Sequence, residues 1–392
     1  MAMKIMYLVD YYGGAQAGTE GQLLQLIQHL DRSRYEPAMT VLRTSDFIQH
    51  TLFCCQVRVL NITKMTSLRS ILKVVRYAWV LRREGYRLVH CFLNDVSIIA
   101  PPILRLFGIR VLVSRRDMGF WYSSWRLAVL RFVGLFVDRY VANCQAVCSV
   151  THQQEWVPYK KISVIYNGVL PHAATVGEVT PVLDLPEVSS FGPVVGIVAN
   201  LKPIKRIDVL IKAFAVICKQ CPAARLVVVG MDGQSQRGQS MREDLEVLAD
   251  ELGIRGHVVF TGGVEATGPY ISRFDVAVLC SESEGFSNAI LEYMRAGRPI
   301  ICTNTGGNPE LIQDGVNGFL VPVGNVDALS DRLGRLLFDR ELAQRLGDAA
   351  RKSIRSTYSH TRMVTEQMIC YDQVLSVTPS NQQLSPVSRV VQ

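Results

Sequence analysis

The stretch Ser281-Glu-Ser-Glu-Gly-Phe-Ser-Asn-Ala-Ile-Leu-Glu292 decides how the rest of this chain is interpreted. It follows the apolar run Val276–Leu279, which has the length of a buried strand. Ser287 or Asn288 can then cap a helix, and Gly297 can end it. A strand, a polar loop and a helix start thus follow one another, as they do in α/β sheets.

Two carboxylates flank the predicted helix start. Glu284 lies just before it, and Glu292 lies more than one turn into the helix. The free N–H groups and the positive dipole end of a helix N-terminus suit a diphosphate. The two glutamates could therefore bind other parts of the same ligand, such as a sugar hydroxyl and a ribose diol. Both could equally be solvated surface residues.

Outward from this stretch, short apolar runs alternate with segments of helical periodicity such as Val209–Cys218. The runs that predict buried strands are Ile5–Val9, Leu88–Cys91, Val111–Ser114, Tyr140–Ala142, Val194–Ala199, Leu226–Val229, Val258–Phe260, Val276–Leu279 and Pro299–Cys302. This alternation predicts doubly wound parallel sheets, whose ligands bind beyond the carboxyl ends of the strands.

A break in composition divides the chain. Residues 171–193 contain four prolines and two glycines without a periodic element, which predicts an interdomain linker. A chain of 392 residues is also longer than one core usually supports, so two domains are expected. The Ser-, Gln- and Pro-rich stretch after about Val377 predicts a disordered tail.

Charge is unevenly distributed between the two halves. Residues 1–190 contain 21 Lys and Arg against 13 Asp and Glu, whereas residues 191–392 contain 21 of each. The basic half is therefore expected to face a more negative partner, either an anionic membrane surface or a phosphorylated acceptor. Nucleic acid ranks last, because no nucleic-acid-binding motif accompanies the charge.

The cysteines indicate a reducing compartment. The ten cysteines are scattered, and the C-x-x-C pair Cys218 and Cys221 has no second pair with which to form a zinc site. Buried reduced thiols, and hence a cytoplasmic protein, are expected. No signal peptide and no uncharged apolar stretch of ~20 residues is visible, so no membrane span is predicted.

The Glu284-Gly-Phe-x5-Glu292 pattern and its neighbours resemble the retaining family-4 glycosyltransferases, which have the GT-B fold of two Rossmann-like domains facing across a cleft. Five further segments resemble that family and follow in the expected order: Val227–Gly233, Val259–Val264, Ala296–Pro299, Thr305–Glu310 and Gly315–Pro322. The similarity spans roughly residues 1–372 and is strongest over 194–325.

The resemblance implies a division of the chain. It predicts an acceptor-side domain over residues 1–175, a donor-binding domain over 191–357 and a helix over 358–376 that crosses back to the first domain. Residues 377–392 would be the disordered tail.

The resemblance also implies a UDP- or GDP-sugar donor site. Glu284 would contact the donor sugar, and Glu292 the ribose. The backbone around Gly285, Phe286, Ser287 and Asn288 would hold the diphosphate, and Gly263 and Val264 would lie in the base-binding loop.

A basic loop after another predicted strand supplies positive charge. The segment Ala199–Asp208 is similar to the Gly-Arg-Leu-x4-Lys loop of the family, and Lys205 matches the lysine that touches the diphosphate. Asn200 stands where the family has arginine, and Lys202 could supply the missing charge. Positive charge lowers the barrier, because the leaving diphosphate becomes more negative as the glycosidic bond breaks. A merely solvated basic loop is the alternative.

The resemblance also places residues of the first half on the other side of the site. Gly18 belongs to a glycine-rich loop similar to one that contacts the donor, and Thr19 with Gln22 fits a capping box. Arg115, Arg116 and Asp117 stand where many family members have a histidine. Together with Asn143 they are acceptor-side candidates, although the charged groups could instead pair with one another.

Two apolar surfaces with interspersed arginines have two interpretations. Leu68, Ile71, Leu72, Val75 and Trp79 recur at helical spacing, and packing of this helix on the sheet is the favoured reading. An interfacial helix at an anionic membrane is the alternative. The segment Phe120–Val137 is apolar on nearly every side and could be core or a membrane patch beside a lipid-linked acceptor.

Together these features predict sugar transfer from a nucleotide sugar to a hydroxyl acceptor with retained configuration, in polysaccharide or glycolipid biosynthesis. No obligatory metal is expected, because no Asp-x-Asp motif is present. The alternatives are a nucleotide-sugar epimerase or hydrolase of the same fold, and a non-catalytic scaffold that binds sugar nucleotides. A redox Rossmann enzyme is disfavoured, because no Gly-x-Gly-x-x-Gly follows the first strand.

Overall fold

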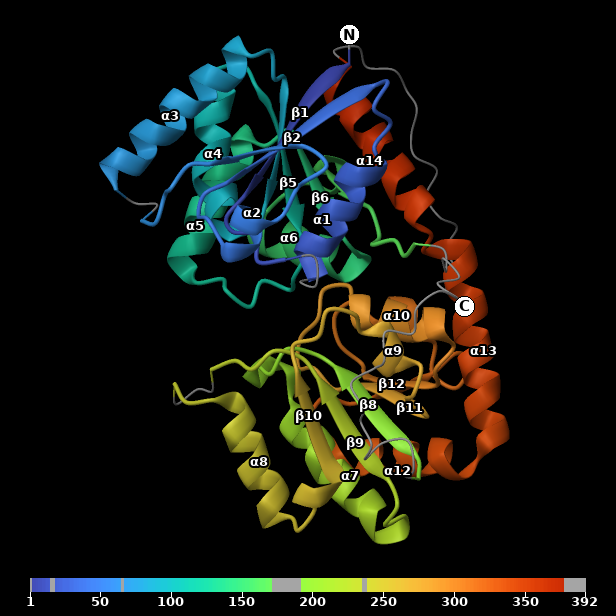
Figure 1. Cartoon of the computed structure of the whole chain (residues 1–392). Helices are drawn as coiled ribbons and strands as arrows, with labels where there is room; N and C mark the ends of the chain where they lie inside the picture. The colour runs from blue at the N-terminus through green and yellow to red at the C-terminus, as the bar shows by residue number, and fades with distance from the viewer. Residues whose placement is uncertain (1, 15–17, 65–66, 171–191, 235–237, 377–392) are drawn as a thin grey trace.

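The computed structural model describes residues 2–14, 18–64, 67–170, 192–234 and 238–376, and shows two stacked α/β units (Figure 1). We call them the N-terminal and the C-terminal unit. Most of the predicted linker and all of the predicted tail lie outside the described residues.

The N-terminal unit contains a seven-stranded sheet in the order β3-β2-β1-β4-β5-β6-β7, with every pairing parallel. Its strands are β1 (Met3–Val9), β2 (Tyr35–Val41), β3 (Gln56–Val59), β4 (Leu88–Phe92), β5 (Arg110–Arg115), β6 (Arg139–Ala142) and β7 (Ile162–Val164). Its helices are α1 (Gly18–His29), α2 (Asp46–His50), α3 (Leu68–Arg83), α4 (Asn94–Leu106), α5 (Ser124–Val133) and α6 (Gln145–Glu155).

The C-terminal unit contains a six-stranded parallel sheet in the order β10-β9-β8-β11-β12-β13. Its strands are β8 (Val194–Val198), β9 (Arg225–Val229), β10 (Val258–Gly262), β11 (Val276–Leu279), β12 (Ile300–Thr303) and β13 (Phe319–Val321). Its helices are α7 (Ile207–Gln220), α8 (Met241–Glu251), α9 (Gly268–Ile271), α10 (Asn288–Ala296), α11 (Asn308–Leu311), α12 (Val326–Phe338) and α13 (Arg340–Thr357).

Both sheets confirm the predicted doubly wound architecture. In each sheet the first strand of the unit lies inside, and the strand order reverses beside it: β2 and β4 flank β1, and β9 and β11 flank β8. Such a reversal opens a crevice at the carboxyl edge of the sheet, where ligands bind. The strands read as continuous apolar runs because helices cover both faces, and Ile5 to Val9 are each at most 1% exposed.

The last helix, α14 (His360–Leu375), packs on the N-terminal unit, whereas α13 runs beside the C-terminal unit (Figure 1). The Tyr371 hydroxyl of α14 lies 3.0 Å from the Tyr7 hydroxyl and 2.9 Å from His90 Nδ1 in the core of the first sheet. Arg34 and Asp372 form an ion pair of 2.6 Å beside them. Complete burial lowers the pKa of His90 to about 3, so this imidazole is neutral and serves the packing.

The favoured reading of α3 is wrong. The helix buries Ser70, Val74, Tyr77, Ala78 and Leu81 against the unit. The predicted packing stripe points outward instead, and its most exposed members are Leu68 at 72%, Leu72 at 58% and Trp79 at 44%. The helix thus carries two apolar rows, and only the row that includes Tyr77 and Ala78 is buried against the unit.

Candidate active site

The loop between β11 and α10 forms as predicted. Ser287 is the N-cap residue of α10, and its hydroxyl accepts a hydrogen bond from the backbone N–H of Ile290. Gly297 ends the helix in the left-handed conformation, with φ of 65°. The remaining N–H groups of the first turn are available to an anion at this end of the helix.

Glu284 and Lys205 meet although they are 79 residues apart in the chain. Lys205 Nζ lies 2.5 Å from Glu284 Oε1, and the Ser281 hydroxyl donates to the same oxygen at 2.6 Å. Lys205 closes a single helical turn, Pro203–Lys205, just before α7. The backbone N–H of Glu282 donates to the Ile204 carbonyl at 2.8 Å, which ties the two loops together.

The two other candidates in the basic loop differ in their surroundings. Asn200 is a structural residue here, because its Oδ1 accepts a hydrogen bond from the backbone of Met231 at 3.1 Å. The Lys202 side chain is exposed, and its amine has no hydrogen bond or ion pair with any residue that the structure describes. It lies near Glu20, whose pKa is raised by burial while the charges of Arg116 and Lys202 oppose that rise.

Glu292 lies in the second turn of α10 and is not part of the Lys205–Glu284 ion pair. Its Oε2 accepts a hydrogen bond of 2.7 Å from the Thr267 hydroxyl, and burial raises the pKa of its carboxyl group. Gly263 lies against Met231, since a Cβ at this glycine would be 2.6 Å from Met231 Cγ. Val264 packs against the core beside it. These residues form one rim of the carboxyl edge of the second sheet.

A chain of amides joins the two units. Asn288 Nδ2 donates to the carbonyl of Gly18 at 2.8 Å, and Asn288 Oδ1 accepts from Asn167 Nδ2 at 2.8 Å. Asn167 Nδ2 also donates to the carbonyl of Phe286 at 3.3 Å, and Asn167 Oδ1 accepts from Arg116 Nη2 at 2.5 Å. The predicted residues Gly18, Arg116, Phe286 and Asn288 are thus brought together through Asn167.

Asn167 has a larger part in this network than the sequence indicated. Its position just beyond β7, at the carboxyl edge of the first sheet, is the signal that could have marked it.

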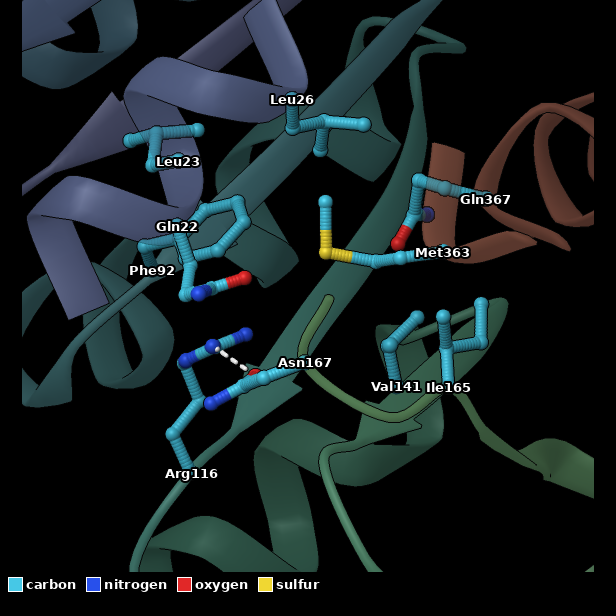
Figure 2. Close-up of a pocket in the computed structure, with 10 residues that line it drawn as sticks. All are labelled: Gln22, Leu23, Leu26, Phe92, Arg116, Val141, Ile165, Asn167, Met363 and Gln367. Atoms are coloured by element: carbon cyan, nitrogen blue, oxygen red, sulfur yellow. Dashed lines mark hydrogen bonds between the residues drawn. The ribbon is translucent and has the colours of Figure 1, made fainter. Parts of the chain in front are cut away.

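The capping box predicted for α1 is wrong. Thr19 lies inside the helix, and the Gln22 side chain pairs with the backbone of Gly168 instead, donating at 3.1 Å and accepting at 3.3 Å. Gln22, Arg116 and Asn167 line a small cavity between α1, the first sheet and α14 (Figure 2). The cavity holds about 20 Å³, enough for about one water molecule and far too small for a nucleotide.

Glu310 makes a second set of contacts between the two units that the sequence did not reveal. Its carboxylate accepts hydrogen bonds from the backbone N–H groups of Gln145 at 2.9 Å and Ala146 at 2.8 Å, at the start of α6. The Tyr166 hydroxyl donates to it at 2.8 Å. A carboxylate from the C-terminal unit therefore caps a helix of the N-terminal unit, where the helix dipole favours negative charge.

The acceptor-side candidates fall into two groups. Arg115 is buried and bound through two hydrogen bonds, of 2.6 and 2.8 Å, to Glu155 rather than to Asp117. Asp117 accepts from the Gly119 backbone and from the Trp121 indole. Asn143 donates to the carbonyl of Arg116 at 3.2 Å. Arg116 differs, since no carboxylate of the described residues forms an ion pair with it, and it remains able to bind an anion.

No group of three or more His, Cys, Asp or Glu within them could hold a metal ion. No helix among them is both long and apolar enough to cross a membrane.

Comparison with known proteins gives two adjacent family matches. Residues 17–172 match the model described as Glycosyltransferase Family 4, and residues 189–353 match the model described as glycosyl transferases group 1. Between them these matches cover the second sheet, every strand of the first sheet except β1, and the Lys205 and Glu284 loops.

Two curated relatives match part of this chain. N-acetyl-alpha-D-glucosaminyl L-malate synthase of Bacillus anthracis is 29% identical over 56% of this chain and 55% of its own length. A GDP-mannose-dependent alpha-(1-6)-phosphatidylinositol monomannoside mannosyltransferase of Mycobacterium tuberculosis is 34% identical over 41% of this chain and 42% of its own. The chain therefore matches about half the length of these relatives or less.

The match to solved structures covers more of the chain than the match to the curated relatives. HepE of Anabaena, solved with UDP and glucose, superposes with a TM-score of 0.79 over 95% of this chain and all of that chain, at 21% identity. This likeness shows that the fold is the same.

Proposed function

The chain belongs to the family-4 glycosyltransferases, and on that premise we propose that it transfers a glycosyl unit from a nucleotide sugar to a hydroxyl acceptor with retained configuration. One observation carries the proposal: Lys205 and Glu284 meet 2.5 Å apart at the loop that leads into α10. A cation, a carboxylate and a helix N-terminus at one point can serve the diphosphate and the sugar of one donor.

In this proposal the charge of the leaving group is the main target of catalysis. The diphosphate lies at the start of α10, where the backbone of Gly285, Phe286, Ser287 and Asn288 faces it. Lys205 neutralises the negative charge that develops as the glycosidic bond breaks, and Lys202 adds a second cation. These groups act without an obligatory metal.

Glu284 orients the donor sugar and stabilises positive charge at its ring in an oxocarbenium-like transition state. The leaving phosphate oxygen takes the proton of the acceptor hydroxyl, so no dedicated base is needed. Glu292 binds the ribose, and Gly263 and Val264 face the base. Arg116, Asp117 and Asn143 face the acceptor, whereas the Arg115 guanidinium is already occupied by Glu155.

The proposed division of labour follows the predicted boundaries. Residues 1–175 form the acceptor side, residues 191–357 bind the donor, and residues 358–376 return the chain to the first unit. The contacts of Tyr371 and Asp372 with the first sheet support the last part.

The donor is proposed to be a UDP- or GDP-sugar, because HepE was solved with UDP and the mycobacterial relative is named as GDP-mannose-dependent. A thermal-shift screen of UDP, GDP and their sugar conjugates tests this, since a ligand that binds only the folded state raises the midpoint of unfolding. The result expected is a selective shift with one base. No shift with any nucleotide would overturn the donor site and favour the scaffold alternative, and release of free sugar without acceptor would favour a hydrolase.

Peripheral association with the inner face of an anionic membrane is part of the proposal. Helices α3, α4 and α5 lie together on one side of the N-terminal unit (Figure 1). We call this surface the flank and define it by large apolar side chains that are at least 44% exposed: Leu68, Leu72, Trp79, Leu106, Phe120, Trp125, Phe132 and Leu135. Large apolar side chains exposed on neighbouring helices are the reason for placing an interaction site on this flank.

The charges of the flank favour an anionic lipid surface. Helices α3 and α5 contain no Asp or Glu, and α3 alone contains five Lys and Arg. Arg83 lies 3.8 Å above the Trp79 ring, and Arg131 lies 3.7 Å above the Trp156 ring, arrangements suited to a membrane interface. A lipid-linked hydroxyl acceptor would then reach the site along the membrane.

A Leu72→Ser/Trp125→Ser/Phe132→Ser variant is expected to bind vesicles containing phosphatidylglycerol at least about tenfold more weakly. The reason is that three apolar side chains that would be removed from water in the membrane are replaced by polar ones. Co-sedimentation measures this. Val247→Ser changes an equally exposed apolar residue of α8 and is the matched control. Equal binding by all three proteins, or none by the unmodified protein, would rule out the flank as a docking surface.

A further inference from the structure

The contact between Lys205 and Glu284 leaves each group occupied by the other before any donor arrives. The two side chains are 23% and 12% exposed, so both charges are largely removed from water and depend on their contact. Lys205 has no other acidic partner among the described residues. A diphosphate that reaches Lys205 must therefore compete with the Glu284 carboxylate.

The Glu284 carboxylate has a second hydrogen-bond partner, which is not expected to bind the donor. The Ser281 hydroxyl donates to Glu284 Oε1 at 2.6 Å, and Ser281 is fully buried. The Ser281 backbone is fixed in turn, because its carbonyl accepts from the Thr303 hydroxyl at 2.6 Å. When Lys205 is taken by a diphosphate, Ser281 still holds the carboxylate in place.

We propose that the donor diphosphate displaces Glu284 from Lys205, and that Ser281 is the positioning residue that keeps the released carboxylate at the sugar. The inference rests on the proposed function and adds a sequence of events to it. The carboxylate is neutralised while the site is empty and becomes free only when a diphosphate has bound. No covalent step is involved, since one ion pair is exchanged for another.

Displacement of Glu284 from Lys205 predicts a change in diphosphate affinity that a donor site without this ion pair would not show. Glu284 repels the diphosphate and competes for Lys205, so removal of its charge should improve binding of a nucleoside diphosphate that carries no sugar. A residue that only contacts the sugar would leave that affinity unchanged. A residue that only stabilises the loop would weaken it.

The experiment measures binding of UDP and GDP by isothermal titration calorimetry. Glu284→Gln keeps the size of the side chain and is expected to bind the preferred diphosphate about fivefold more tightly while transfer falls. Glu246→Gln is the matched control, because it removes an ion-paired glutamate of α8 that contacts Arg242 and Arg255. Unchanged or weaker binding by Glu284→Gln would overturn the exchange.

Ser281→Ala tests the positioning role. It is expected to lower kcat about tenfold or more with KM for the donor and affinity for the diphosphate little changed, since the carboxylate is lost from its place only after binding. An unchanged kcat, or a parallel loss of diphosphate affinity, would contradict it. Thermal unfolding of each variant shows that it is folded. Failure of the unmodified protein to bind either diphosphate would instead count against the proposed function.

Discussion

Replacing Lys205 with alanine is expected to lower kcat/KM for sugar transfer by about two to three orders of magnitude. The amine is the cation closest to Glu284, and in the proposed reaction it faces the leaving diphosphate as its charge grows. Loss of a preorganised charge that acts mainly in the transition state reduces kcat as well as binding. Steady-state kinetics with the donor found by the thermal-shift screen measure the effect.

Lys212→Ala is the matched control, since it removes another lysine of the same region that pairs with Asp208 outside the proposed site. Its kcat/KM should stay within about twofold of the unmodified value, as surface ion pairs contribute little. A Lys205→Ala protein that is folded and retains more than a tenth of the activity would place the leaving group elsewhere.

The parts of the structure that could be predicted are those fixed by local sequence. The strand Val276–Leu279, the cap at Ser287 and the stop at Gly297 follow from hydrophobic runs, hydroxyl caps and the left-handed conformation that glycine permits. The doubly wound sheets follow from the same alternation repeated along the chain. The resemblance to the family implied that Lys205 and Glu284 share one site, and the structure brings the two side chains together because both follow strands of one parallel sheet.

The parts that could not be predicted depend on which side chains meet across the two units. Asn167 and Asn288 are 121 residues apart, and Gln145 and Glu310 are 165 apart. No periodicity in the sequence reports such pairs. Gln22 shows the same limit, since its spacing from Thr19 fits a cap whereas its amide has a better partner in Gly168.

Helix α3 shows a different limit. Periodicity identifies an apolar face but does not say which of two apolar rows touches the sheet. Here the row that includes Tyr77 and Ala78 is buried against the unit, and the row around Leu72 and Trp79 remains exposed. The exposed row of α3 is part of the flank.

Gly285→Ala is expected to reduce kcat/KM about a hundredfold, although the change adds only one methyl group. A Cβ at this position would lie 2.2 Å from the backbone oxygen of Arg116 and 2.9 Å from its carbonyl carbon. Backbone atoms at the end of β5 cannot move aside as a flexible side chain would. The two units must therefore separate, and a shift of about 1 Å between reacting groups is enough to cost about a hundredfold.

The glycine at position 256 gives the control, since a Cβ there would meet nothing within 4 Å. Gly256→Ala should leave kcat/KM near its original value. If Gly285→Ala retained full activity with an unchanged unfolding midpoint, the contact between Gly285 and Arg116 could not belong to the catalytic arrangement. A large loss of kcat/KM with diphosphate affinity preserved would show that the donor loop still binds, and that transfer requires the acceptor side of the first unit to approach it closely.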